Sequence, residues 1–123
     1  MEITIKWIGG ASIILLTNDL KIAMDPVLCP KGTVQDYFWF KSERIEPPVF
    51  TDQDFEQIDL WLITHDHEDH LDQMGLSKMD DSSKCICNQN AYHKLRKNRK
   101  KDVTVLDWDQ QQVIFLKDYK IEI

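Results

Sequence analysis

Three of the four histidines lie within six residues, interleaved with carboxylates, in the segment Thr64-His65-Asp66-His67-Glu68-Asp69-His70-Leu71-Asp72. Imidazole nitrogens are good ligands for divalent transition metals such as zinc, and carboxylates widen the choice toward manganese or iron. A turn that carries His65 and His67 can present both rings to one cation, while Asp69 and His70 reach a second cation beside it. The segment therefore predicts a site for one or two divalent metal ions, with zinc favoured and manganese compatible.

The histidine segment directly follows a short apolar run, Leu60-Trp61-Leu62-Ile63. An almost continuous apolar run of this length is typical of a strand that is buried on both faces. A polar loop that is rich in histidine by chance rarely follows such a strand, so the metal-site interpretation is favoured over that alternative. The histidines would then lie at the carboxyl end of the strand, where sites in layered α/β folds commonly occur.

The pattern H-x-H-x-D-H after an apolar strand resembles the signature of the metallo-β-lactamase superfamily. The continuation Asp69 to Asp72 is similar to its branch of ascorbate-6-phosphate lactonases and N-acyl phosphatidylethanolamine phospholipases D. Two further segments, Trp7-Ile8-Gly9-Gly10-Ala11-Ser12 and Ala23-Met24-Asp25-Pro26, are similar to other motifs of that branch. Gly10 stands where many members carry His, so the histidine motif is the specific part of the resemblance.

The resemblance implies that His65 and His67 bind a first metal and that Asp69 and His70 bind a second, with Asp69 also orienting the nucleophilic water. It implies a hydrolase that acts on a small-molecule ester, lactone or phosphodiester through a metal-bound hydroxide. Asp25, at the end of a predicted strand, is either a carboxylate that orients a ligand histidine or a turn residue before a proline. Two other functions stay open, a metal-dependent nuclease and a non-catalytic remnant that keeps the motif without a complete site.

The fold implied by the resemblance is α/β, the N-terminal half of a metallo-β-lactamase-like αββα sandwich, with a mainly antiparallel sheet and helices on its outer face. Residues 1–123 would form one such domain, truncated before the C-terminal half. The family adds two further histidines downstream, whereas after His70 this sequence offers only His93. We therefore expect an incomplete site in this chain alone, an exposed apolar sheet face, and a second copy or the missing half as partner.

Hydropathy patterns predict the elements that position the motif. Ile3, Ile5 and Trp7 alternate with polar residues, which predicts a strand with one buried face. Thr51 with Asp54, Asp72 and Asn88 supply the start signals of three helices. The predicted strands are 3–7, 12–16, 21–24, 60–63, 84–87, 103–106, 113–116 and 120–123, and the predicted helices are 51–57, 73–79 and 89–97.

No period holds between Val27 and Val49, and the prolines there break regular elements. Four adjacent aromatic residues, Tyr37 to Phe40, are a large apolar load to leave in water. They predict a segment that is covered, either as a cap over the sheet edge or as a substrate wall or oligomer contact.

Composition describes one globular domain: 123 residues, 42% of them hydrophobic, with a net charge of −6. No apolar run approaches the roughly 20 residues of a membrane span, and the absence of a basic leader predicts a cytoplasmic protein. The three cysteines, Cys29, Cys85 and Cys87, are interpreted as buried free thiols.

Charge is segregated along the chain, with acids concentrated in residues 52–81 and bases in residues 84–101. Acids around the histidines would attract divalent cations, whereas the bases form either a binding patch or a solvated helix face. The acidic overall charge and the lack of interleaved aromatics disfavour nucleic acid as a partner. His93 lies among these bases, where positive neighbours oppose a metal, and is predicted to be a surface residue.

Overall fold

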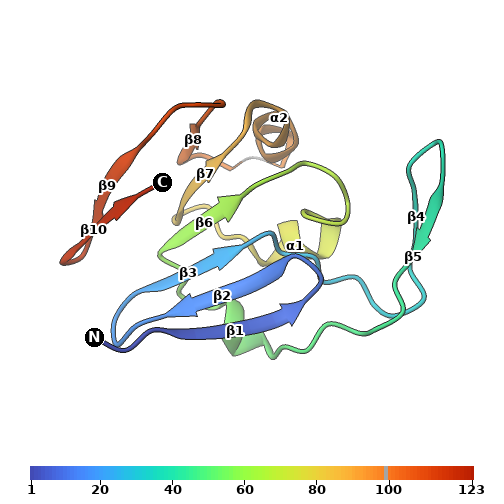
Figure 1. Ribbon diagram of the computed structural model, residues 1–123, viewed down its shortest axis with the longest axis horizontal. Helices are drawn as coiled ribbons and strands as arrows, with labels where there is room; N and C mark the ends of the chain where they lie inside the picture. Colours follow the sequence, from blue (N-terminus) through green and yellow to red (C-terminus); the bar gives the residue numbers. More distant parts are fainter. Residues whose placement is uncertain (99) are drawn as a thin grey trace.

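A six-stranded sheet forms the centre of the computed structural model, which describes every residue except 99 (Figure 1). Its strands are β1 Thr4–Gly9, β2 Ser12–Leu16, β3 Lys21–Met24, β6 Leu60–Ile63, β7 Lys84–Cys87 and β8 Val103–Val105, in the order β1-β2-β3-β6-β7-β8. The first three strands pair antiparallel, whereas β3, β6, β7 and β8 pair in parallel. The sheet is therefore mixed rather than mainly antiparallel as predicted, because each parallel pair joins two strands whose connecting segment contains a helix.

Helices cover one face of this sheet, as the family resemblance implied. They are the 3-10 helix η1 Asp52–Phe55 and the α-helices α1 Gln73–Lys78 and α2 Gln89–Lys97. Their buried side chains pack on Trp61, which is 1% exposed, and on its neighbours in the sheet. The predicted caps of the two α-helices are confirmed, because Asp72 accepts from Gly75 N and Asn88 from Ala91 N. The helix predicted for residues 51–57 is shorter, since only Asp52–Phe55 forms a 3-10 helix. No helix in the described part of the chain is long and apolar enough to cross a membrane.

The opposite face of the sheet is only partly covered. The hairpin of β9 Val113–Leu116 and β10 Tyr119–Glu122 packs there on Leu60 and Ile86. At the β1 edge this face is open, and Ile5 and Trp7 are 64% and 69% exposed. The prediction that the alternating apolar side of β1 is buried is wrong, because the helices lie on its other side, where Ile8 is buried. The sheet thus exposes apolar side chains along β1, as expected.

A second hairpin, β4 Val34–Asp36 and β5 Lys41–Glu43, stands apart from the sheet, on the side toward which β3 and β6 point (Figure 1). Sequence patterns did not predict it, because its short strands are exposed on both faces and lack a buried period. The prediction that Tyr37 to Phe40 is covered is wrong for Phe38, Trp39 and Phe40, which are 86%, 87% and 62% exposed. Tyr37 alone turns inward, stacked on Phe40.

All three cysteines are free and buried, as predicted. Cys85 and Cys87 point to the helix-covered face of β7, where both belong to the main core. The hydrogen bond to the Cys87 thiol, together with burial, raises the pKa of the Cys85 thiol. Cys85 is therefore a packing residue that stays protonated at neutral pH.

Gly75 makes a close approach between α1 and the segment after β3. A Cβ added there would lie 1.8 Å from the carbonyl oxygen of Pro26, so the helix can pack here only without a side chain. Replacing a glycine in a helix interior by alanine normally stabilises a protein by about 1 kcal/mol. We expect the opposite for Gly75→Ala, a loss of about 1–3 kcal/mol in the free energy of unfolding.

Urea unfolding followed by circular dichroism measures this change. Ser77→Ala, an exposed substitution in the same helix, is the matched control and should change stability by less than about 0.5 kcal/mol. A Gly75→Ala protein as stable as the parent would mean that the Pro26 segment moves aside freely.

Candidate metal centre

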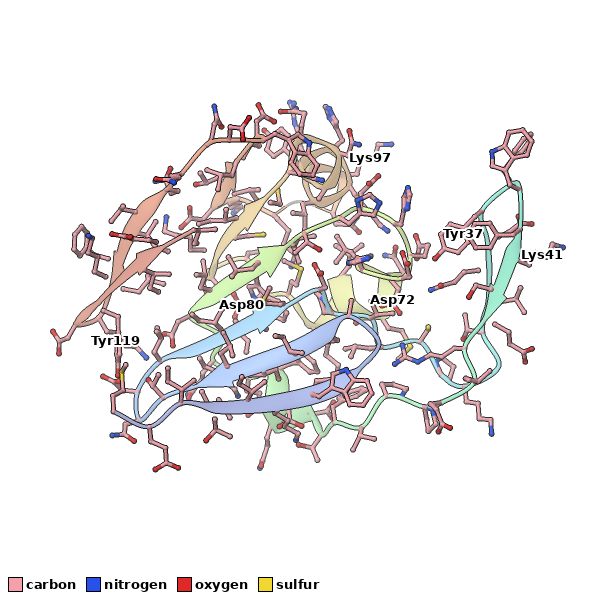
Figure 2. The ribbon with its side chains drawn as sticks, in the orientation of Figure 1. Tyr37, Lys41, Asp72, Asp80, Lys97 and Tyr119 are labelled. Carbon is pink, nitrogen blue, oxygen red and sulfur yellow. The ribbon has the colours of Figure 1, made fainter. Side chains whose placement is uncertain are left out.

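The histidine loop, defined here as residues 64–72, connects β6 to α1 at the carboxyl end of the parallel strands. Its middle closes as a tight turn, in which His67 O accepts from the amides of His70 and Leu71, both at 2.9 Å. Its end is anchored by Asp72, shown in Figure 2, whose buried carboxylate accepts from Leu28 N at 2.8 Å and Cys29 N at 2.7 Å. The loop is thus held between the sheet and the segment after β3.

The four predicted ligand residues lie together in this loop. The ring centroids of His65 and His67 are 4.0 Å apart, and those of His65 and His70 are 5.3 Å apart. Asp69 Oδ2 is 3.9 Å from His70 Nε2. Two imidazoles thus lie side by side, with a third imidazole and a carboxylate near them, and the role of these four residues as metal ligands stays a prediction.

Asp66 also belongs to this cluster, although the sequence did not single it out. Ligand atoms of His65, Asp66 and His67 all lie within 4.8 Å of one another. Asp66 Oδ1 is buried and has no hydrogen-bond partner among the described residues. A buried carboxylate oxygen without a donor is unfavourable, and a cation would satisfy it. Two imidazoles and a carboxylate therefore fit a divalent metal by their donor chemistry.

Asp25 orients His70 and is also the turn residue before Pro26, so both interpretations of this residue apply. Its buried carboxylate accepts from Thr64 N at 2.7 Å through Oδ1, and from the Thr64 hydroxyl through Oδ2. Oδ2 also lies 2.9 Å from His70 Nδ1. A proton on Nδ1 completes this contact and leaves the Nε2 lone pair of His70 available to a metal.

Lys94 of α2 holds the histidine loop from the helix side. Its ammonium donates to Glu68 Oε1 at 2.8 Å, to the Asp66 carbonyl at 3.1 Å and to the Leu71 carbonyl. The sequence placed this lysine in the basic run, with no sign of a specific partner. No local pattern marks these partners, because the contacts join residues 23 to 28 positions apart in the chain.

The other bases and His93 do not join the site. Lys84 and Lys100 lie within salt-bridge distance of Asp102 and Asp81. His93 is exposed on α2, as predicted, and its Nε2 lies 3.4 Å from the Gln89 amide nitrogen. Arg99 of the basic run lies outside the described residues. The described bases therefore form paired or solvated positions rather than one patch, which weakens the nuclease alternative.

The β4–β5 hairpin forms a wall beside the histidine loop. Gln35 Nε2 donates to Glu68 O at 2.8 Å, and the ring centroid of Tyr37 is 5.9 Å from that of His67. In Figure 2, Tyr37 extends from the hairpin toward the rest of the molecule. Tyr37 and His67 border a cavity of about 540 Å³, which Trp39 and Asp69 also line. Burial and the negative charge of Asp69 raise the pKa of Tyr37 to about 12, which keeps its phenol protonated. The hairpin therefore lies against the histidine loop, and its role as a substrate wall stays a prediction.

Comparison with known proteins identifies the family. Residues 4–122 match the model of a family described as "Beta-lactamase superfamily domain". The chain belongs to this family. The resemblance to the metallo-β-lactamase superfamily is thereby confirmed, and its particular relation to lactonases stays a prediction.

Relatives of this superfamily member are longer proteins. It is 30% identical over 73 residues to the N-acyl-phosphatidylethanolamine-hydrolyzing phospholipase D 1 of Caenorhabditis elegans, over 59% of this chain and 20% of that protein. It is 31% identical over 77 residues to a metal-dependent hydrolase of Sulfolobus acidocaldarius, over 62% of this chain and 28% of that protein.

The fold itself recurs in a solved structure described as a possible metal-dependent hydrolase from Veillonella parvula, with a TM-score of 0.70. The two sequences are 19% identical, and the match covers 91% of this chain and 47% of that chain. This likeness confirms the predicted fold. The chain spans less than half the length of each of these proteins.

Replacement of Asp25 by Asn should weaken metal binding without removing a ligand. The amide can still accept from Thr64 N, but it cannot accept the His70 proton as a carboxylate does, so the imidazole loses its fixed orientation. We expect zinc affinity to fall about 10–100-fold, measured by competition with a chromophoric chelator. Asp118→Asn, at an exposed position far from the loop in sequence, makes the same change of charge and should leave the affinity unchanged. Equal affinity of both variants would contradict the orienting role.

Proposed function

We propose that this superfamily member contributes the first metal ligands of a metal-dependent hydrolase that acts on an ester, a lactone or a phosphodiester. The observation that carries the proposal is the cluster of His65, Asp66 and His67, next to His70 oriented by Asp25. The names of the two curated relatives support a hydrolase and, in one case, a phospholipid phosphodiester as substrate.

Each residue of the loop has a role in this proposal. His65 and His67 bind a first cation, and Asp69 and His70 bind a second. Asp66 can supply a further carboxylate ligand to one of these cations. A divalent cation held here supplies a Lewis acid that lowers the pKa of water toward about 7 and stabilises developing negative charge. Asp69 orients the attacking water, because its side chain is 54% exposed and lines the same cavity as His67. The protonated phenol of Tyr37 can donate to an oxygen of the substrate from the opposite wall.

Metal uptake tests the proposal directly. Replacing His65 and His67 together by alanine should remove most bound zinc, because two imidazoles of one cation are lost at once. Metal analysis of the dialysed protein gives the stoichiometry. His93→Ala, the histidine outside the cluster, is the matched control and should bind as much zinc as the parent. An unchanged stoichiometry in the double variant would refute the assignment of the site.

A second prediction concerns turnover by this chain alone. A catalytic zinc takes about three protein ligands plus water, and a two-metal site needs more donors than the loop provides. We expect the isolated chain to bind metal weakly, to associate through its open sheet face at Ile3, Ile5 and Trp7, and to hydrolyse esters and phosphodiesters far below ordinary enzyme rates.

Sedimentation velocity and hydrolysis assays across added zinc and manganese measure both properties. Ile5→Lys, which puts a charge on the open face, should reduce association while the histidine loop is unchanged. A stable monomer that turns over substrate at ordinary rates would show that the ligand count is wrong.

A further inference from the structure

A second cavity, of about 340 Å³, adjoins the metal centre on the side of the β1–β2 turn. Its apolar walls include Trp7, Val27 and Pro47, and Asp69 of the histidine loop also lines it. Arg44, which follows β5, is the only cationic side chain among its described lining residues. The cavity therefore combines an apolar lining, one positive charge and one residue of the metal centre.

The guanidinium of Arg44 is fixed in place by neutral acceptors. Nε donates to Glu46 O at 2.9 Å, and Nη1 donates to Val27 O at 2.9 Å and lies 3.7 Å from Cys29 Sγ. Within the described part of the chain, no carboxylate lies within 4.0 Å of this guanidinium. The backbone carbonyls hold it rigidly but leave its full charge uncompensated by an ion pair, a state that favours an anionic ligand.

The remaining terminal nitrogen, Nη2, lies at the cavity wall beside Gly9. A Cβ added to Gly9 would be 2.9 Å from Nη2, so the guanidinium reaches this position because residue 9 has no side chain. Gly9 lines the cavity as well, and Nη2 donates no hydrogen bond to any residue that the structure describes. Its N–H groups are thus available to a molecule in the cavity.

We propose that Arg44 binds an anionic oxygen group, a carboxylate or a phosphate, on a substrate whose apolar part fills this cavity. This inference rests on the proposed hydrolase function, since Asp69 links the cavity to the loop at which the reaction would occur. Three carboxylates, those of Glu43, Glu46 and Asp69, also line the cavity, but all three residues are exposed, so water screens their charges more than that of the half-buried Arg44. Arg44 would then select substrates that carry a negative group at a set distance from the bond that is cleaved.

Ligand binding by the metal-free protein tests the proposal without any turnover. The probes are 4-phenylbutyrate, phenyl phosphate and the neutral 4-phenylbutanol, titrated while NMR follows the amides of Gly9 and Gly10. We expect both anions to shift these signals and to bind at least about tenfold more tightly than the alcohol, the size of effect of a charge-assisted hydrogen bond. A preference between the two anions tells which oxygen group the site takes.

Two variants and a control separate recognition from structural support. Arg44→Gln should weaken binding of the anions at least about tenfold and that of the alcohol less than about twofold. Ile45→Glu changes a residue that is 73% exposed, leaves the contacts of Arg44 intact, and should also weaken anion binding by repulsion. Lys41→Gln removes an exposed cation that does not line the cavity and should change neither affinity.

Equal affinity for the acids and the alcohol, or anion binding that survives both Arg44→Gln and Ile45→Glu, would overturn the proposal. If Arg44→Gln does not fold, Ile45→Glu decides alone. Since no metal is present in these titrations, their failure would leave the metal site untouched. A failure of metal uptake would likewise leave the anion site to be judged separately.

Discussion

The buried carboxylate of Asp25 is the contact on which the arrangement of the site depends. It lies at the end of β3 and binds the first residue after β6 through both the amide and the hydroxyl of Thr64. Its third partner is the His70 ring. Burying a carboxylate is costly unless hydrogen-bond donors surround it. Here the donors are Thr64, directly after β6, and His70, a candidate ligand, so one carboxylate fixes the position of both. The sheet and the candidate ligands are therefore coupled through one side chain.

Two further contacts complete the support of the histidine loop. Asp72 links its end to the amides after Pro26, and Lys94 links its middle to α2. All three supports reach backbone groups of the loop or of the segment beside it, so they set the path of the chain and leave His65 and His67 free to face a ligand. A loop held in this way needs little reorganisation on binding, because its conformation is already determined without the metal.

Local signals predicted much of this structure, since they depend only on neighbouring residues. Asp72 and Asn88 marked helix starts that the structure confirms, and the apolar run 60–63 became the buried strand β6. The face that β1 buries could not be predicted, because Ile5 and Ile8 are equally apolar and the choice depends on where distant helices pack. The β4–β5 hairpin, the contacts of Lys94 and the cavity around Arg44 likewise depend on long-range contacts, for which periodicity carries no signal.

Gly9, the last residue of β1, and Gly10 after it shape the cavity beside the metal loop. Gly10 has a φ of 56°, and a Cβ there would meet no atom within 4 Å, so the fold does not itself require the small residue for space. Gly10 lines the same cavity as Asp69 and Arg44. In relatives with His at this position, an imidazole would extend from this turn, whereas here the same region stays open next to a rigid guanidinium. Gly at position 10 therefore leaves open a part of the cavity beside the metal loop that a larger side chain would fill.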